Sequence, residues 1–135
     1  MINPEHFFSE WFGNPGATEL ALAALKEQCG GELPAGYEEF LRFSDGGEGR
    51  IGRLYITIWS TGEIHSRNDR QGITSELPSL VGIADDGPHF YGLDKSTACR
   101  SIVRIPLGDF HPDMWQRIAV SFVELLRKLK DGEIC

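Results

Sequence analysis

The residues best suited to chemistry lie in the stretch VGIADDGPHFYGLD, between Val81 and Asp94. It contains two adjacent aspartates, a histidine and a tyrosine, and such groups commonly build metal sites and acid–base pairs. If the fold brought Glu48 to Asp86 and His89, these three side chains could form an active site. An enzyme of this kind is one hypothesis for the chain.

The same stretch has the pattern of a β-hairpin. An Asp-Gly pair between two apolar runs is a strong signal for a tight turn, and Pro88 fixes φ just after it. Neighbouring side chains on a strand point to opposite faces of the sheet, so Asp85 and Asp86 would not bind one ion together. His89 and Tyr91 would share one face of the second strand. We therefore favour the hairpin over a catalytic or metal site.

The motifs that mark common enzyme classes are missing from the sequence. It contains no CxxC, HExxH, GxSxG or GxxxxGK pattern. The glycine-rich DGGEG follows a predicted helix, whereas a phosphate-binding loop opens one. The four histidines are scattered, and Cys99 has no histidine at an informative spacing. The sequence predicts a protein that is not an enzyme and that needs no cofactor or metal.

Three helices are predicted in the first third of the chain. Residues 4–12 carry aromatic side chains at helical spacing, Thr18 has the type of an N-cap, and Pro34 is well placed to open a helix. Gly30 would end the second helix. The first helix would carry Phe7, Phe8, Trp11 and Phe12, and the second would carry Leu20, Ala21, Ala24 and Leu25. In the third, Tyr37, Phe40 and Leu41 would share one face.

Strands and a final helix follow. β-Branched and aromatic residues predict strands at 53–59 and 101–107, and the hairpin contributes two more. Residues 60–72 are polar and predict a loop that begins with a short helical turn. An apolar stripe over 115–129 predicts one helix, with Gly132 after its end. The fold class is α+β, with amino-terminal helices, a twisted mixed or antiparallel sheet and a carboxy-terminal helix.

The charge is concentrated at one end of the sequence. Residues 1–49 contain nine acidic and two basic side chains, a net charge of −7, whereas the remaining residues are neutral overall. Such a field repels nucleic acid and acidic membrane surfaces and attracts basic partners. A simpler interpretation is that the charge keeps the protein soluble. The acidic composition, with a pI of about 5.0, argues against nucleic-acid binding.

The cysteines and the amino terminus indicate a compartment. Three widely spaced cysteines do not form a disulfide framework and are typical of a reducing environment. The amino terminus has no secretory signal pattern, and no apolar run is long enough to span a bilayer. We expect a cytoplasmic protein.

Three segments resemble the SUKH superfamily, the Smi/Knr-type domain. ELPAGYEEFLRFSDGGEG is similar to the family's leucine-proline, tyrosine, phenylalanine-leucine and glycine-glycine pattern, and VGIADDGPHFYGLD resembles its central hairpin. Glu63, Ile64 and Asn68 match the segment between them. The resemblance covers roughly residues 17–135 of a single domain, 1–135, so that residues 1–16 form an aromatic extension. Pro88 stands where the family usually has a second glycine.

The resemblance implies an α+β domain whose matched residues are structural. Leucine and aromatic side chains would seat a helix on the sheet, and glycines would permit close turns: Leu33, Tyr37, Phe40 and Leu41; Gly46, Gly47, Gly87 and Gly92. Bacterial members are similar to immunity proteins that neutralise toxins, many of them nucleases. Other members are scaffolds or regulators, including in fungal cell-wall assembly. No catalytic motif of the family can be transferred.

The hypothesis favoured by the resemblance and the acidic first third is an immunity protein that binds a basic toxin domain. The alternative is a housekeeping scaffold or regulatory module without a toxin partner. The sequence does not indicate an oligomeric state. The predicted partner-binding acids lie in the helical half and, as a second group, at the sheet rim: Glu32, Glu38, Glu39, Asp45 and Glu48; Asp85, Asp86 and Asp94.

Overall fold

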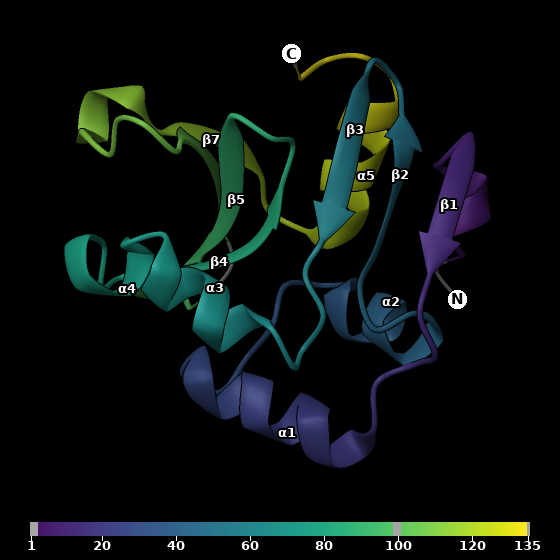
Figure 1. The fold of residues 1–135 in the computed structure, drawn as a ribbon, viewed down its shortest axis with the longest axis horizontal. Coiled ribbons are helices and arrows are strands. Elements are labelled where there is room, and N and C mark those ends of the chain that lie inside the picture. Colours follow the sequence, from purple (N-terminus) through teal and green to yellow (C-terminus); the bar gives the residue numbers. More distant parts are fainter. Residues whose placement is uncertain (1–2, 99–100, 135) are drawn as a thin grey trace.

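The computed structural model describes residues 3–98 and 101–134. These residues form one antiparallel sheet with helices packed against it (Figure 1). Its strands follow chain order from edge to edge, and each pairs with the next. They are β1 (Glu10–Gly13), β2 (Gly47–Ile51), β3 (Leu54–Ile58), β4 (Leu80–Asp85), β5 (His89–Asp94), β6 (Ile102–Pro106) and β7 (Gln116–Ala119). Cys99 and Cys135, two of the three cysteines considered in the sequence, lie outside the described residues.

Helices and short 3₁₀ turns accompany the sheet, which confirms the predicted α+β class. α5 lies behind β2 and β3 in Figure 1, and α3 and α4 pack on β4. The helices are α1 (Glu19–Gln28), α2 (Tyr37–Phe43), α3 (Ile64–Arg70), α4 (Ile73–Glu76) and α5 (Phe122–Lys130), with turns η1 (Pro4–His6), η2 (Lys95–Thr97) and η3 (Pro112–Met114). Among the described residues, none of these helices has the length and apolar character needed to cross a membrane.

The aromatic core joins α2 and α5 beneath the sheet. Tyr37, Phe40 and Leu41 are fully buried, as predicted for the inner face of α2. The Phe122 ring lies 5.0 Å from that of Tyr37 and 5.1 Å from that of Phe40. Large buried rings contribute much of the apolar area that stabilises a domain of this size.

The helix predicted over residues 4–12 is wrong. Only η1 is helical there, and the chain then extends into β1 because β2 offers it a glycine-rich partner. A Cβ on Gly49 would lie 2.0 Å from the carbonyl oxygen of Glu10, so glycine permits the close approach of the two strands. Trp11 turns inward, with its ring 4.5 Å from Phe8 and 5.5 Å from Phe40. Tertiary strand pairing has overridden the helical spacing.

The helix predicted over residues 115–129 is also too long. Its first part forms β7, which pairs with β6, and α5 begins only after Ser121. The Ser121 hydroxyl accepts a hydrogen bond from the backbone N–H of Glu124 at 3.0 Å, while the Glu124 carboxylate accepts one from Val120 N–H at 2.8 Å. This is close to a capping box, which the Ser-x-x-Glu spacing signals in the sequence. Gly132 follows the helix as predicted, with φ 73°.

Two further details differ from the prediction. Thr18 caps α1, accepting from Ala21 N–H at 3.1 Å, but the helix buries Leu22 and Leu25, and Leu20 is 83% exposed. Residues 60–72 hold the helix α3, not merely one turn. The polar composition of α3 concealed it, because only Ile64 and Asn68 of this helix face the protein interior.

Candidate partner-binding surface

The hairpin from β4 to β5 separates its two aspartates, as strand geometry predicted. Asp86 N–H donates to the His89 carbonyl at 3.0 Å, and His89 N–H donates to Asp86 Oδ1 at 2.9 Å. Gly87 between them has φ 98°, which a tight turn of this kind requires at its first central position. Asp85 and Asp86 bond to different groups, Trp59 on one side and Tyr91 on the other.

Asp86 is the centre of a buried polar cluster. Its side chain is 1% exposed and accepts hydrogen bonds from Arg104 Nη2 at 2.8 Å, Arg104 Nε at 3.1 Å and the Tyr91 hydroxyl at 2.8 Å. Burial by itself would raise the pKa of Asp86, but the hydrogen bonds from Arg104 and Tyr91 and the charge of Arg104 outweigh burial, so the pKa is lowered. Burial and the charge of Asp86 raise the pKa of Tyr91. The cluster ties the hairpin to β6.

The three residues proposed for an active site do not meet. Asp86 Oδ1 lies 3.4 Å from His89 Nδ1, but Glu48 lies on β2, with β3 between its strand and β4. Glu48 pairs with Thr57, and Thr57 pairs with Asp85, which places Glu48 on the Asp85 side of the sheet, away from the Asp86 carboxylate. Within residues 3–98 and 101–134, no group of three or more His, Cys, Asp or Glu side chains could hold a metal ion.

Asp94 and Asp45 are also committed to internal bonds. The Asp94 side chain, 2% exposed, accepts from Ser96 N–H and hydroxyl at 3.0 and 2.6 Å and from Arg117 at 2.9 Å. Asp45 accepts from Thr61 N–H at 2.7 Å and from the Thr61 hydroxyl at 2.8 Å. These carboxylates hold neighbouring loops in place.

Asp85 supports the junction between β4 and α3. It accepts from Trp59 Nε1 at 2.8 Å, and Arg67 lies 3.7 Å away while stacking over the Trp59 ring at 5.3 Å. Arg67 also donates to Glu63 at 3.1 Å. Asp85 therefore belongs to a partly exposed charge network and is only in part available to a partner.

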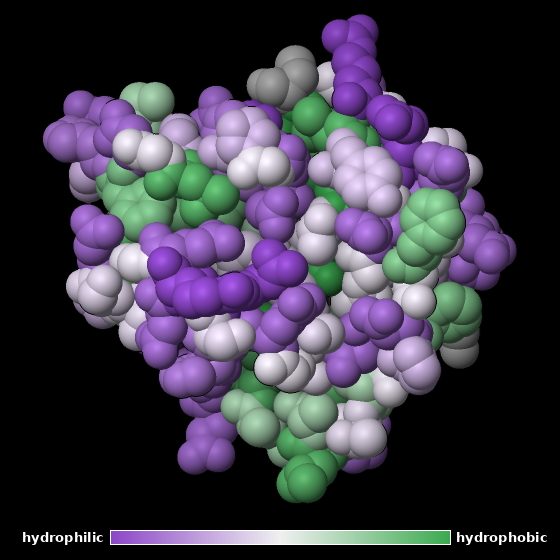
Figure 2. Space-filling model, in the orientation of Figure 1, coloured by the Kyte–Doolittle hydropathy of each residue, from purple (hydrophilic) through white to green (hydrophobic). Residues whose placement is uncertain are grey.

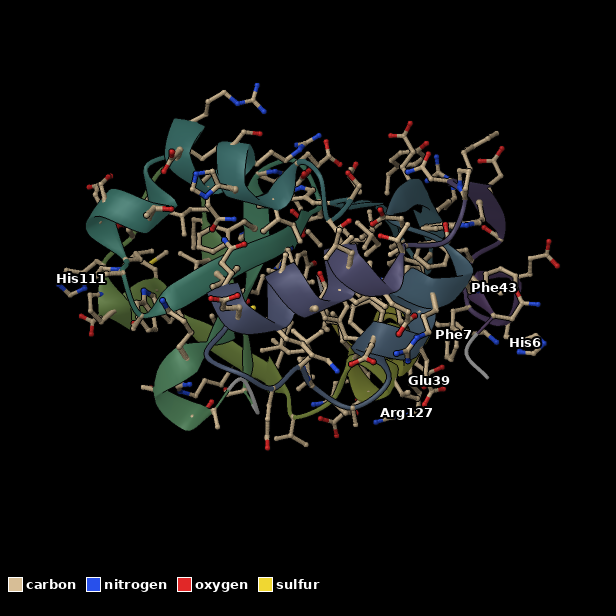
Figure 3. The ribbon with its side chains drawn as sticks, turned by 90° about the horizontal axis from the view of Figure 1, so that it is seen from below. His6, Phe7, Glu39, Phe43, His111 and Arg127 are labelled. Atoms are coloured by element: carbon tan, nitrogen blue, oxygen red, sulfur yellow. The ribbon has the colours of Figure 1, made fainter. Side chains whose placement is uncertain are left out.

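The helical acids fall into paired and unpaired groups. Glu38 binds Lys26 at 2.6 Å and Arg42 at 2.5 Å, and its pKa is lowered chiefly by the hydrogen bond from Lys26. Arg42 also binds Glu19 at 2.9 Å, so both basic residues of the first third are engaged. Glu32 and Glu39 are exposed, and no ion pair involves either one in the described part of the chain. Glu39 lies at the outer edge of the molecule in Figure 3.

Glu48 lies on a side of the sheet that none of the described helices covers. Burial alternates along β2 and β3, whereas β4, β5 and β6 are buried almost throughout because elements cover both of their faces. We call the uncovered side of β1–β3 the open face. Its residues are Glu10 and Phe12 of β1, Glu48 and Arg50 of β2, and Tyr55 and Thr57 of β3.

The open face combines aromatic and acidic side chains in two rows. One row runs Glu10–Arg50–Tyr55 across the strands, and the other runs Phe12–Glu48–Thr57 and continues to Asp85. Phe12 is 60% and Tyr55 40% exposed. Partial burial and then the negative charges of Glu48 and Glu10 raise the pKa of Tyr55, while Arg50 opposes this shift.

A polar hollow adjoins the open face and is lined by Phe12, Glu48, Thr57, Glu63 and Arg67, among others. Figure 2 shows this side of the molecule, with apolar green and pale side chains among purple ones over β1–β3 at the right. Sequence reasoning selected Glu48 but not the other residues of the open face. The signal for them is the alternation of side chains in EWFG, GEGRI and LYITI, which becomes visible once the first two segments are recognised as strands.

Comparison with known proteins identifies a matching family model. The model of the SMI1 / KNR4 family (SUKH-1) matches residues 16–128. β1 therefore precedes the matched region but pairs with β2 inside it. No curated protein shows a significant match to the chain.

Proposed function

Because the chain belongs to the SMI1 / KNR4 family (SUKH-1), we propose that it is a non-catalytic protein-binding domain, and specifically an immunity protein that neutralises a basic toxin domain in the cytoplasm. The family match over most of the chain carries the proposal. Nucleic-acid-cleaving toxins need basic clefts to hold their substrate, and an acidic protein can approach such a cleft rapidly and cover it.

The distribution of charge supports this function. Glu32, Glu39 and Glu48 are exposed and have no ion pair in the described residues, so a basic partner can reach them without breaking an existing bond. Asp45, Asp86 and Asp94 are bonded internally and are left out of the proposed surface. Glu38 and Asp85 already have ion pairs within the protein and are only in part available to a partner.

The first test is affinity capture of the tagged protein from its source organism, with captured proteins identified by mass spectrometry. We expect one toxin carboxy-terminal domain in near-stoichiometric amount. Co-expression of that domain with this chain should restore growth of cells that the domain alone kills. Capture of cell-wall or signalling proteins only, with no protection of cells, would instead indicate a housekeeping scaffold.

A further inference from the structure

We propose that the open face is the contact surface for the partner, and that it binds an arginine-rich protein segment. This inference rests on the proposed function and assigns it a place on the molecule. β1 turns the partly buried Trp11 towards Phe40 of α2, and β2 and β3 have buried residues on the same side of the sheet. The other side of these three strands has no cover in the described structure. It exposes two aromatic rings, Phe12 and Tyr55, which are residue types enriched in protein interfaces.

The side chains on the open face suit guanidinium groups. Arginine stacks on aromatic rings and donates two parallel hydrogen bonds to a carboxylate. Glu48 lies directly beside Phe12 on the neighbouring strand and diagonally from Tyr55. A bound side chain can therefore contact a carboxylate and an aromatic ring at the same place. An arginine between Glu48 and either ring could use both groups at once.

The charges of the open face also select for a cation. Glu10 and Glu48 have no ion pair in residues 3–98 and 101–134. Burial is the main cause of the raised pKa of Tyr55, and the charges of Glu48 and Glu10 add to it, while Arg50 opposes the shift. Across the strands, Glu10 pairs with Arg50 and Phe12 pairs with Glu48. The neighbouring Arg67 is occupied by Glu63 and Asp85 and stacked on Trp59.

The helical surface offers less of this combination. Its bases Lys26 and Arg42 already neutralise Glu38 and Glu19. Of its exposed acids, Glu39 has one exposed ring nearby, Phe43 four residues on in α2, whereas Glu48 has a ring beside it and a second one diagonal to it. We therefore expect the helical acids to attract a basic partner over a distance, while the open face makes the contact.

The test uses a synthetic peptide of alternating arginine and threonine, and a matched peptide with citrulline in place of arginine. Titration of the ¹⁵N-labelled protein should shift backbone amide signals in β1, β2 and β3. The double variant Glu10→Lys/Glu48→Lys should weaken the Kd by about tenfold or more. The matched variant Glu32→Lys/Glu39→Lys makes the same change in net charge and should weaken it by about threefold or less. Arg50→Gln should tighten binding.

The outcomes separate this inference from the proposed function. Shifts centred on α1 and α2, equal weakening by both double variants, equal binding of the citrulline peptide, or no binding would each overturn the open face as the contact surface. Toxin neutralisation could still succeed in any of these cases. Conversely, peptide binding on the open face without neutralisation of any toxin would support the surface and reject the immunity function.

Discussion

At the scale of single residues, Asp86 has a structural role that its sequence context concealed. The same aspartate that suggested an active site is enclosed by Arg104, Tyr91 and the turn backbone. Removing one partner of a buried ion pair is strongly destabilising, because the charge that remains has lost the interaction that offset its burial.

We predict that Asp86→Asn lowers the free energy of unfolding by about 3 kcal/mol or more at neutral pH, because the buried ion pair between Asp86 and Arg104 is broken. Urea denaturation followed by tryptophan fluorescence measures the change. Asp113→Asn, at an exposed position in η3, is the control and should change it by less than about 0.5 kcal/mol. A difference below 1 kcal/mol between the two variants would contradict the role assigned to the cluster.

The pH dependence should distinguish the charge of Asp86 from its packing. Its pKa is lowered in the folded protein, so its ionised form stabilises the fold fully above the unfolded pKa, near 3.9. That contribution is lost as the pH falls through the folded pKa. The stability gap between wild type and Asp86→Asn should therefore narrow below about pH 4 in acid titrations of unfolding. A gap that is constant from neutral pH to pH 2 would show that the charge contributes nothing.

Asn68 has a similarly local role in joining α3 to β4. Its side-chain amide donates to the Ile64 and Gly82 carbonyls at 2.7 and 2.9 Å, and its oxygen accepts from Gly82 N–H at 2.7 Å. We predict that Asn68→Leu lowers the free energy of unfolding by about 2–4 kcal/mol, because buried backbone groups of Gly82 lose their partners. Ser66→Ala on the exposed side of α3 should have little effect. Thermal unfolding of both variants provides the comparison.

At the scale of elements, β1 depends on glycine in its neighbour. The strand has four residues, and its pairing with β2 requires the missing side chain of Gly49. We predict that Gly49→Ala releases β1, which hydrogen exchange would detect as lost protection at Trp11 and Gly13. The expected destabilisation is about 1–3 kcal/mol. Gly62→Ala, where a Cβ would meet nothing within 4 Å, should leave exchange in β1 unchanged.

Release of β1 also has a functional consequence, because β1 supplies Glu10 and Phe12 to the open face. A Gly49→Ala protein that keeps its other strands should bind the arginine peptide more weakly than the wild type. The effect would show that a segment ahead of the region matched by the family model forms part of the contact surface.

At the scale of the whole molecule, the acidic field and the contact surface are separable. Net charge acts at long range and sets the encounter rate, whereas local contacts set the lifetime of a complex. Both double variants change the net charge from −7 to −3. They should therefore slow association with the captured partner alike, by about two- to threefold at low salt.

Only the open-face variant should also shorten the lifetime of the complex. We expect Glu10→Lys/Glu48→Lys to raise the dissociation rate by about threefold or more, while Glu32→Lys/Glu39→Lys leaves it nearly unchanged. Association rates of the wild type should fall as salt is added, because exposed charges are screened. Surface plasmon resonance over a range of ionic strengths measures both rates. Faster dissociation of the helical variant alone would move the contact to α1 and α2.

The sequence by itself determined the features that depend on neighbouring residues. The inner face of α2, the cap at Thr18, the Asp-Gly hairpin and the opposed aspartates all follow from side-chain type and spacing within one element. The α+β class and the family followed from the order of such segments. These predictions succeeded because local geometry and the tertiary structure favour the same conformation.

Tertiary structure alone decided the rest. β1 and β7 became strands because neighbouring edges offered unpaired backbone groups, which outweighed the helical spacing of their side chains. Asp86 and Asp94 became internal because distant arginines, Arg104 and Arg117, lie beside them in the fold. The open face exists only because β1 pairs with β2, which brings Phe12 to Glu48. Alternating side chains mark one face of each segment, but that β1 and β2 are strands and lie side by side depends on contacts between residues far apart in the chain.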